Sequence, residues 1–304
     1  MANESLNSTA GDIRAAQILN RDVHLLLTDA VDISTLATMY EFSPGGSLVQ
    51  KVGQLQSTYD FAVTAENAAA ANTALVDGSI SLTPARHTLR FENSDLFTLG
   101  AGDVESVGQN VFAQAIVNSV GRHRTKLLTA LFSSLTNTVG AGAGDDFSVD
   151  TAFSAIFAMN NNLNAGRQAF VLKPHQLNEL ISSLRGETGA VGRLDDQNAA
   201  VLAAKGVGMQ AMWMGREIWT SDHVVEGSGV CNGALIGEGA LAMLEAPVAR
   251  MRRVLKDMTF EDAVLLITET PDDEKGTLRT IGNYYPAVAI QEQARAVLIE
   301  TDDI

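Results

Sequence analysis

The amino-acid sequence predicts a mixed α+β fold, and three observations carry this prediction. Apolar residues recur at helical spacing over residues 103–135. Residues 168–184, QAFVLKPHQLNELISSL, read as a buried strand, a proline and an amphipathic helix. Two strand-rich segments, 262–269 and 277–300, lie near the C-terminus. Helices and strands therefore follow one another in mixed order, and no internal repeat or long linker divides the chain into independent domains.

The first elements are short and have little core of their own. Residues 12–30 show an amphipathic pattern that predicts one or two short helices. After a Ser-Pro-Gly-Gly turn at 43–46, two alternating runs, 47–55 and 79–91, flank a polar, alanine-rich stretch. They predict a long two-stranded hairpin. Such a hairpin is marginally stable alone, so we expect it to lie against another surface.

The long helix is the strongest structural signal. The helical spacing over 103–135 corresponds to about 50 Å at 1.5 Å per residue. Asp103 can cap its start, and the glycine-rich segment 137–146 ends it. Ser148 or Asp150 can then cap a second helix over 149–163. A helix as long as the first is unusual in a globular domain and predicts a structural spine.

The second half of the chain alternates strands and turns. In FVLKPHQLNEL, residues 170–180, a lone histidine follows a strand and a proline, so His175 is either a site residue or part of a strand-to-helix corner. Segments 215–224 and 232–244 predict two strands joined by a turn, the second strand running into a short helix. The charged stretch 270–276 predicts a hairpin turn between the two C-terminal strand-rich segments.

The composition excludes several classes of protein. Hydrophobic residues make up 46% and charged residues 19%, which is typical of a globular protein. No apolar run is long enough to span a bilayer, and the N-terminus lacks the features of a secretory signal. The net charge of −15 disfavours binding of phosphate backbones over the whole surface. The one cysteine, Cys231, is interpreted as a small buried apolar residue in a chain compatible with a reducing cytoplasm.

The sequence offers no clear catalytic or metal-binding pattern. The five histidines are scattered and form no short ligand pair. Gly140, Gly142 and Gly144 follow a helix and lack a phosphate-loop lysine, so they predict a linker. Ser228 lies in a Gly-Ser-Gly turn rather than a nucleophile elbow. In TSDH, residues 220–223, adjacent side chains on a strand point to opposite faces, so the motif does not predict a triad.

A basic cluster stands out in the acidic chain. It consists of Arg250, Arg252, Arg253 and Lys256. It can contact an acidic face of a neighbouring copy, balance local charge, or bind nucleic acid. Contact with a neighbouring copy and local charge balance are favoured about equally. Nucleic-acid binding is less favoured because the surface is acidic.

Four segments together resemble the major capsid proteins of tailed bacteriophages, which have the Hong Kong 97-type fold also used by encapsulin compartments. Segment 170–180 resembles the strand-Pro-helix corner of that family, and 214–224 the strand that ends in a Ser-Asp turn. Segment 234–244 resembles the Gly-x-x-Ala element that follows, and 103–135 lies where the family has its spine helix. Their order and spacing give the resemblance its specificity. His175 is then a corner residue rather than a ligand.

The resemblance implies a domain plan for an α+β fold of the Hong Kong 97 type. It places an N-terminal arm at 1–40, an E-loop hairpin at 41–85, a first P-domain part at 86–147 with the spine helix 103–135, an A-domain at 148–245, and P-domain return strands at 246–304. The arm begins almost at once, so we expect a separate scaffold or none. Some relatives link an E-loop lysine covalently to a neighbouring asparagine. Lys51 is the lysine of this loop, but the sequence does not indicate the partners of that cross-link.

The resemblance also implies a function. We expect a structural protein, not an enzyme, that self-assembles as pentamers and hexamers into an icosahedral shell enclosing double-stranded DNA. No catalytic, cofactor-binding or metal-binding residue is expected. The candidate contacts between subunits are Lys51, Arg250, Arg252, Arg253 and Lys256.

The expected partners are further copies of the chain, with scaffolding, portal and decoration proteins as additional candidates. DNA is enclosed without sequence-specific binding, and no membrane is involved. The expected location is the virion capsid, after assembly in the host cytoplasm. Two alternatives remain open: an encapsulin-like compartment shell, and a soluble α/β enzyme that uses distant residues such as His175 and Asp222.

Overall fold

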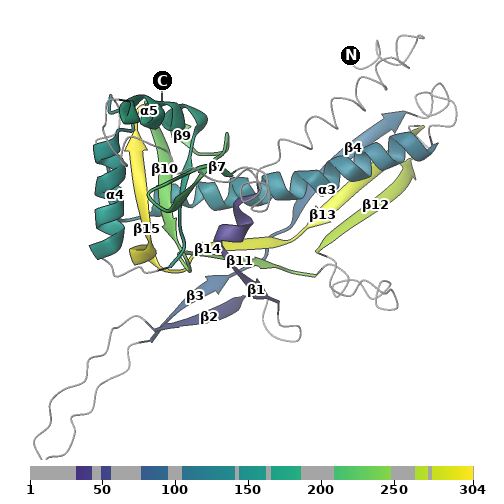
Figure 1. Cartoon of the computed structure of the whole chain (residues 1–304). Helices are drawn as coiled ribbons and strands as arrows, with labels where there is room; N and C mark the ends of the chain where they lie inside the picture. Colours follow the sequence, from purple (N-terminus) through teal and green to yellow (C-terminus); the bar gives the residue numbers. More distant parts are fainter. Residues whose placement is uncertain are drawn as a thin grey trace, which may run out of the picture.

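A long helix, two groups of strands and a projecting hairpin make up the fold (Figure 1). The computed structural model describes residues 32–42, 49–55, 77–94, 105–140, 144–161, 166–185, 209–247, 264–272 and 276–303. Helix α3 (Glu105–Ala130) runs across the molecule and joins its two ends. The helices expected within 12–30, the Asp103 cap and the tip of the expected hairpin lie outside the described residues. The mixed α+β prediction is confirmed.

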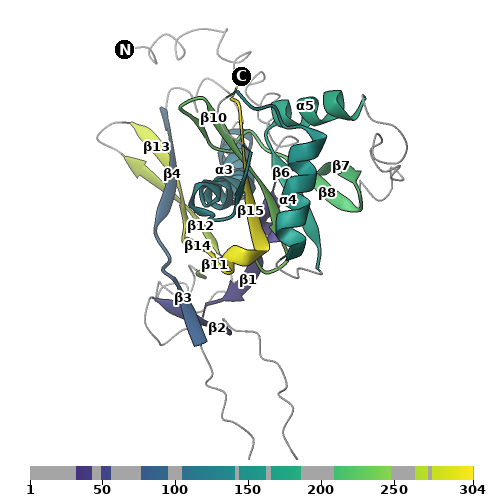
Figure 2. The ribbon, with the colours of Figure 1, turned by 90° about the vertical axis from the view of Figure 1, so that its left-hand side faces the viewer.

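A seven-stranded sheet forms one end of the molecule. Its order is β5-β15-β10-β6-β8-β7, with β9 also paired to β10. The strands are β5 (Thr138–Val139), β6 (Gln168–Leu172), β7 (Met209–Trp213), β8 (Arg216–Thr220), β9 (Glu226–Gly227), β10 (Val230–Gly237) and β15 (Ala296–Thr301). Helices α4 (Val149–Asn161) and α5 (Pro174–Leu184) lie beside this sheet (Figure 2). Residues 246–304 supply β15 to this sheet, next to β10.

The predicted strand-Pro-helix corner is confirmed. All five residues of β6 are buried, as expected for an interior strand. Pro174 begins α5, where its fixed φ suits the first turn and its missing N–H costs nothing. The Lys173 N–H donates to Gln176 Oε1 at 3.0 Å, which holds the entry to the helix. For α4, Ser148 is the cap, because its Oγ accepts from the Thr151 N–H at 3.2 Å.

Helix α3 packs on a second sheet, of order β12-β13-β4. Its antiparallel strands are β12 (Leu265–Asp272), β13 (Thr277–Tyr284) and β4 (His87–Ser94). The predicted hairpin of these two strands is confirmed by their pairing, although β12 extends to Asp272 and so includes the first three residues of the expected turn 270–276. Helix and sheet approach closely at Gly282, where an added Cβ would lie 2.4 Å from Ile116 Cγ2.

The long helix ends earlier than the sequence predicted. Helical spacing extended to residue 135, but α3 ends at Ala130 and a tighter turn, η3 (Phe132–Ser134), follows. Leu131, Ser134 and Leu135 each bond a carbonyl three residues earlier, as in a 3₁₀ turn. Phe132 and Leu135 are still buried. The apolar period therefore marked core contacts beyond the end of the α-helix.

The predicted hairpin is present, but its second strand is shorter than expected. Strands β2 (Gln50–Leu55) and β3 (Asp77–Leu82) pair antiparallel, and the pair projects away from the rest of the molecule (Figures 1 and 2). The run 79–91 was expected as one strand, but it divides into β3 and β4. The division spans residues 83–86, which include Pro84, and proline has no N–H for a sheet ladder.

The base of the hairpin packs on a three-stranded sheet, of order β1-β11-β14. The strands are β1 (Thr38–Glu41), β11 (Leu241–Glu245) and β14 (Pro286–Ile290), and η2 (Ile33–Leu36) precedes β1. Leu82 of β3 is fully buried among Ala242, Leu244 and Ala287. The prediction of a short helix at the end of segment 232–244 is wrong. Residues 241–245 form the central strand of this sheet, because an apolar run paired on both edges is an interior strand.

Candidate functional site

The expected contact residues are only partly described. Lys51 is exposed on β2, where it is paired with Ser81 near the base of the hairpin. Arg250, Arg252, Arg253 and Lys256 lie outside the described residues. Within the described part of the chain no helix is long and apolar enough to cross a membrane. No group of three potential metal ligands was found among the same residues.

His175 lies at the strand-to-helix corner, as predicted. It is the second residue of α5 and is partly buried. Its Nε2 lies 3.2 Å from the Asp302 carbonyl oxygen, and its Nδ1 lies 4.0 Å from Glu226 Oε1. The ring therefore connects the corner to the C-terminal segment and to β9.

Three other sequence features have structural roles. Ser228 and Gly229, with φ of 60° and 80°, form the turn between β9 and β10. In the TSDH motif, the His223 N–H donates to Ser221 Oγ at 3.1 Å, so these neighbours form a turn rather than a triad. Cys231 is fully buried, as predicted. Burial, with smaller effects of nearby acids, raises the pKa of its thiol to about 12.

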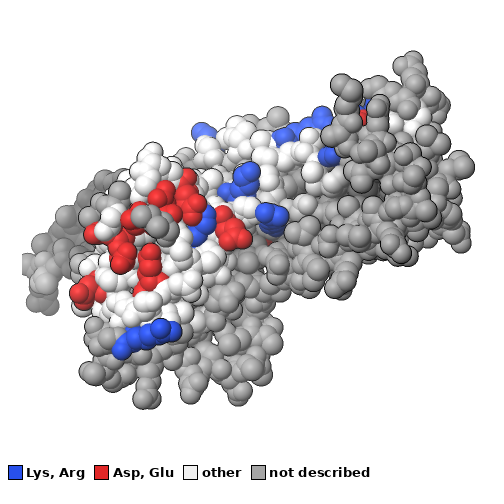
Figure 3. Space-filling view, turned by 90° about the horizontal axis from the view of Figure 1, so that it is seen from above, with Lys and Arg blue, Asp and Glu red and all other residues white. Residues whose placement is uncertain are grey.

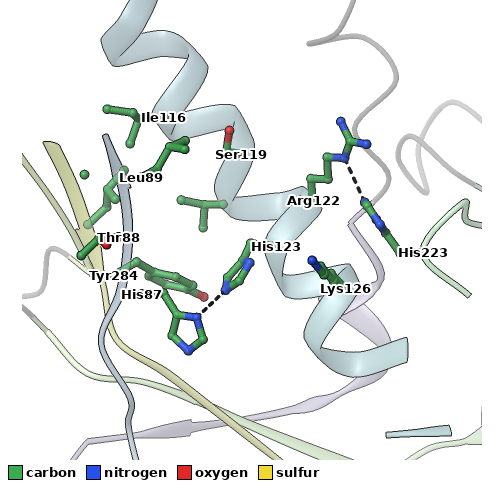
Figure 4. A pocket seen from close by; sticks show the side chains of 13 residues that line it. His87, Thr88, Leu89, Ile116, Ser119, Arg122, His123, Lys126, His223 and Tyr284 are labelled. Carbon is green, nitrogen blue, oxygen red and sulfur yellow. Dashed lines mark hydrogen bonds between the residues drawn. The ribbon is translucent and has the colours of Figure 1, made fainter. Parts of the chain in front are cut away.

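A pocket of about 380 Å³ opens between α3, β4 and β13 (Figure 4). Its apolar walls include Leu89, Ile116, Val120 and Leu265. Its polar lining residues are His87, Thr88, Ser119, Arg122, His123, Lys126, His223 and Tyr284. Neither His175 nor Asp222 lines it, although the enzyme alternative relied on them.

Two hydrogen bonds join three separate segments at this pocket. His123 Nε2 of α3 lies 2.9 Å from His87 Nδ1 of β4, and one ring donates to the other. Arg122 Nε donates to His223 Nε2 at 2.9 Å, so this nitrogen of His223 carries no proton. The pocket thus connects α3 to β4 and to the turn after β8.

The surroundings keep two of these imidazoles neutral. Burial lowers the pKa of His123, and the charges of His87, Lys126 and His223 lower it further. Burial also lowers the pKa of His223, with contributions from Arg122 and Lys126, whereas Asp222 acts in the opposite direction. Both rings are therefore uncharged near neutral pH, which agrees with their hydrogen bonds.

A second polar network holds α3 on β11 and β13. Arg124 donates to both carboxylate oxygens of Glu245, at 2.6 and 2.7 Å, and to Asp32 at 3.3 Å. The Tyr284 hydroxyl also donates to Glu245. Burial lowers the pKa of the Arg124 guanidinium, but hydrogen bonds to Glu245 and Tyr284 outweigh it and raise the pKa above its ordinary value. This network lies next to the pocket, because Tyr284 takes part in both.

Sequence reasoning missed this arrangement. It treated each histidine as an isolated structural residue, yet the fold brings His87, His123 and His223 to one pocket. One signal was present: residues 119, 122, 123 and 126 are spaced three or four apart and therefore share one face of a helix. No local pattern indicated that β4 and the turn after β8 would meet that face.

The chain resembles known proteins in structure but not detectably in sequence. No model of a protein family matches the sequence, and no curated protein matches it. A capsid structure of the cyanophage P-SCSP1u matches with a TM-score of 0.60 at 13% identity, covering 90% of this chain and 89% of that chain. The capsid of a native GTA particle matches with a TM-score of 0.59 at 14% identity, covering 89% and 90%.

The chain has the fold of phage capsid proteins. The resemblance expected from the sequence is confirmed at this level. The fold also occurs outside phages. The SrpI encapsulin from Synechococcus elongatus PCC 7942 matches with a TM-score of 0.56 at 11% identity, covering 89% of this chain and 87% of that chain. The same fold therefore occurs in a phage capsid and in an encapsulin.

Proposed function

We propose that the chain is a major capsid protein that self-assembles as pentamers and hexamers into an icosahedral shell enclosing double-stranded DNA. The observation that carries the proposal is the fold shared with phage capsids over about nine tenths of both chains. Because the match covers almost the whole of both chains, it concerns the complete architecture rather than one common motif. On this proposal the protein is not an enzyme, and its activity is assembly.

The Hong Kong 97 domain plan belongs to this proposal. Residues 1–40 are the N-terminal arm, 41–85 the E-loop, 86–147 the first part of the P-domain and 148–245 the A-domain. Helix α3 is the spine helix. The return segment 246–304 contributes β12, β13 and β14 to the P-domain, and we assign its last strand, β15, to the A-domain sheet because it pairs with β10.

The projecting hairpin supports assembly on physical grounds. Its base is anchored by one small cluster around Leu82. An isolated two-stranded ribbon gains little stability from its own contacts. A neighbouring subunit can supply the missing surface, and exposed Lys51 can pair with an acid there. Arg250, Arg252, Arg253 and Lys256 are proposed as further contacts to acidic faces of neighbours.

The acidic charge of the chain suits the proposed contents of the shell. The net charge of −15 suits a container that encloses DNA without gripping it in a sequence-specific way. Scaffolding, portal and decoration proteins are proposed as partners. The protein would be assembled in the host cytoplasm and end in the virion capsid.

The encapsulin match favours a second candidate function, a compartment shell that holds a cargo enzyme. The two functions differ in contents rather than in fold. Particles purified from the native source after nuclease treatment would hold protected double-stranded DNA in the first case. In the second case they would hold a discrete protein cargo and little nucleic acid.

The first experiment is negative-stain electron microscopy with light scattering on the protein expressed alone. Shells, or rings of five and six subunits, are the expected result. A discrete dimer or tetramer under all conditions, unchanged by added scaffold candidates, would contradict the proposal.

A variant with a shortened hairpin tests the role of the E-loop in assembly. Replacing residues 56–76 with Asn-Gly closes the hairpin between the paired Leu55 and Asp77. We expect the shortened chain to fold, because the buried clusters of the described residues are built from other parts of the chain, and to lose shell formation. Normal shells from this variant would remove the E-loop from the proposal.

A further inference from the structure

The pocket beside α3 differs in charge from the chain as a whole. The chain carries 36 acidic and 21 basic residues. None of the described residues that line the pocket is an Asp or Glu, whereas five are Arg, Lys or His. On the face drawn in Figure 3, the acidic side chains of the described residues gather elsewhere. In Figure 3 most of the red atoms lie over the end that carries α5 and β9, and most of the blue atoms lie away from it.

Two cationic side chains at the pocket, Arg122 and Lys126, can form further hydrogen bonds or ion pairs. Arg122 uses its Nε on neutral His223 and is exposed. Lys126 is also exposed, and no described carboxylate forms an ion pair with either residue. Arg124, between them in sequence, differs because it is held by Glu245. The two cations of α3 that have no carboxylate partner among the described residues therefore line the pocket, whereas Arg124 is held by Glu245 and Asp32.

The shape of the pocket restricts what can enter it. A volume of about 380 Å³ has room for roughly a dozen waters, and so for one or two side chains. Its walls at Leu89, Ile116 and Leu265 are apolar. A nucleic-acid phosphate supplies an anion but no apolar group to pack against these walls. An acidic side chain with an apolar neighbour satisfies both parts of the pocket.

We propose that this pocket binds an acidic segment of a second copy of the chain, with a carboxylate on Arg122 and Lys126 and an apolar side chain against Leu89 and Ile116. A second copy can supply the anion because acids are in excess and gather on a different part of the surface. Two different patches that bind each other give a head-to-tail contact, which can close into a ring. The inference rests on the proposed function and adds a specific contact to it.

Zero-length cross-linking tests this contact directly. Equal amounts of ¹⁴N- and ¹⁵N-labelled chains are assembled together and treated with a carbodiimide, which joins an amine to a carboxylate only where they touch. Mass spectrometry then separates links within one subunit from links between subunits. Lys173 and Glu226 form an ion pair within one subunit and serve as the internal control. We expect Lys126 to give links of mixed isotope, and the linked peptide identifies the segment.

The possible cross-linking results either support the contact or contradict it. Shells that show the Lys173–Glu226 link but no link at Lys126 would refute it while leaving the proposed function intact. A Lys126 link of one isotope only would mean that the chain's own segment fills the pocket. If no shells form, a mixed-isotope link in a smaller oligomer would still support the contact. Protection of Lys126 from acetylation only in DNA-filled particles would identify nucleic acid as the occupant.

A charge-reversal variant gives an independent measurement. Arg122→Glu with Lys126→Glu should raise the protein concentration needed for assembly at least tenfold, which is more than loss of the single exposed Arg122–His223 hydrogen bond would cause. The matched control is Arg185→Glu, an exposed residue at the end of α5, which should assemble like the parent chain. Equal assembly of both variants would refute the contact.

Discussion

The substitution Glu245→Gln tests how α3 is held in place. It keeps the shape of the side chain and one acceptor oxygen but removes the negative charge that binds Arg124 and Tyr284. The Glu245 side chain is 8% exposed and that of Arg124 is 23% exposed, so the ion pair is mostly shielded from water. Asp32, at 3.3 Å, is the other carboxylate that pairs with Arg124 in the described chain.

The expected loss of stability follows from this burial. Removing one partner of a fully buried ion pair costs about 3–5 kcal/mol. Asp32 and the partial exposure of Arg124 reduce that cost, so we expect about 2–3 kcal/mol. Glu92→Gln is the matched control, because Glu92 is 42% exposed in its pair with Arg279. Exposed pairs contribute about 0–1 kcal/mol.

Urea unfolding below the assembly concentration measures both variants. The chain has two tryptophans, Trp213 and Trp219, and both are buried, so their fluorescence reports unfolding. With a slope of about 3 kcal/mol per molar urea, the midpoint of Glu245→Gln should fall by about 0.8 M. A fall no larger than that of Glu92→Gln would show that the network does not hold the helix.

Three further predictions use the same assay or thermal unfolding. Gly282→Ala should cost about 1–3 kcal/mol, because its methyl group would meet a buried side chain of α3, whereas Gly53→Ala, with open space around it, should change little. Ser148→Ala should cost about 1 kcal/mol through loss of the α4 cap. The pKa values of His123 and His223 are lowered from 6.5 in the folded chain, so their contribution to stability is complete above that value and is lost as the pH falls below it. Stability should therefore fall between pH 7 and 5.5, and the double substitution of both residues by Gln should flatten this slope. An unchanged slope, an unaffected Ser148 variant or equal effects of the two glycine changes would contradict these predictions.

Much of the fold was predictable because its signals are local. The β6–α5 corner was found from an apolar run, Pro174 and a helical period within seventeen residues. The β12–β13 hairpin and the α4 cap were predicted on the same basis. The errors arose where local signals were ambiguous. A short apolar run at 241–245 suits a helix or an interior strand, and only its pairing with β1 and β14 decides between them.

The sequence by itself determined the α+β class, the long helix and the order of most elements, since each depends on residues close together in the chain. It determined the acidic charge by composition alone. It also indicated, through the order of four motifs, the resemblance to capsid proteins. Only the tertiary structure decided which distant residues meet. His87 and His123 are 36 residues apart, and Arg122 and His223 are 101 apart. No periodicity encodes such pairs, because they depend on how the sheets close around α3. The pocket, its excess of basic residues and the Arg124 network all follow from that closure.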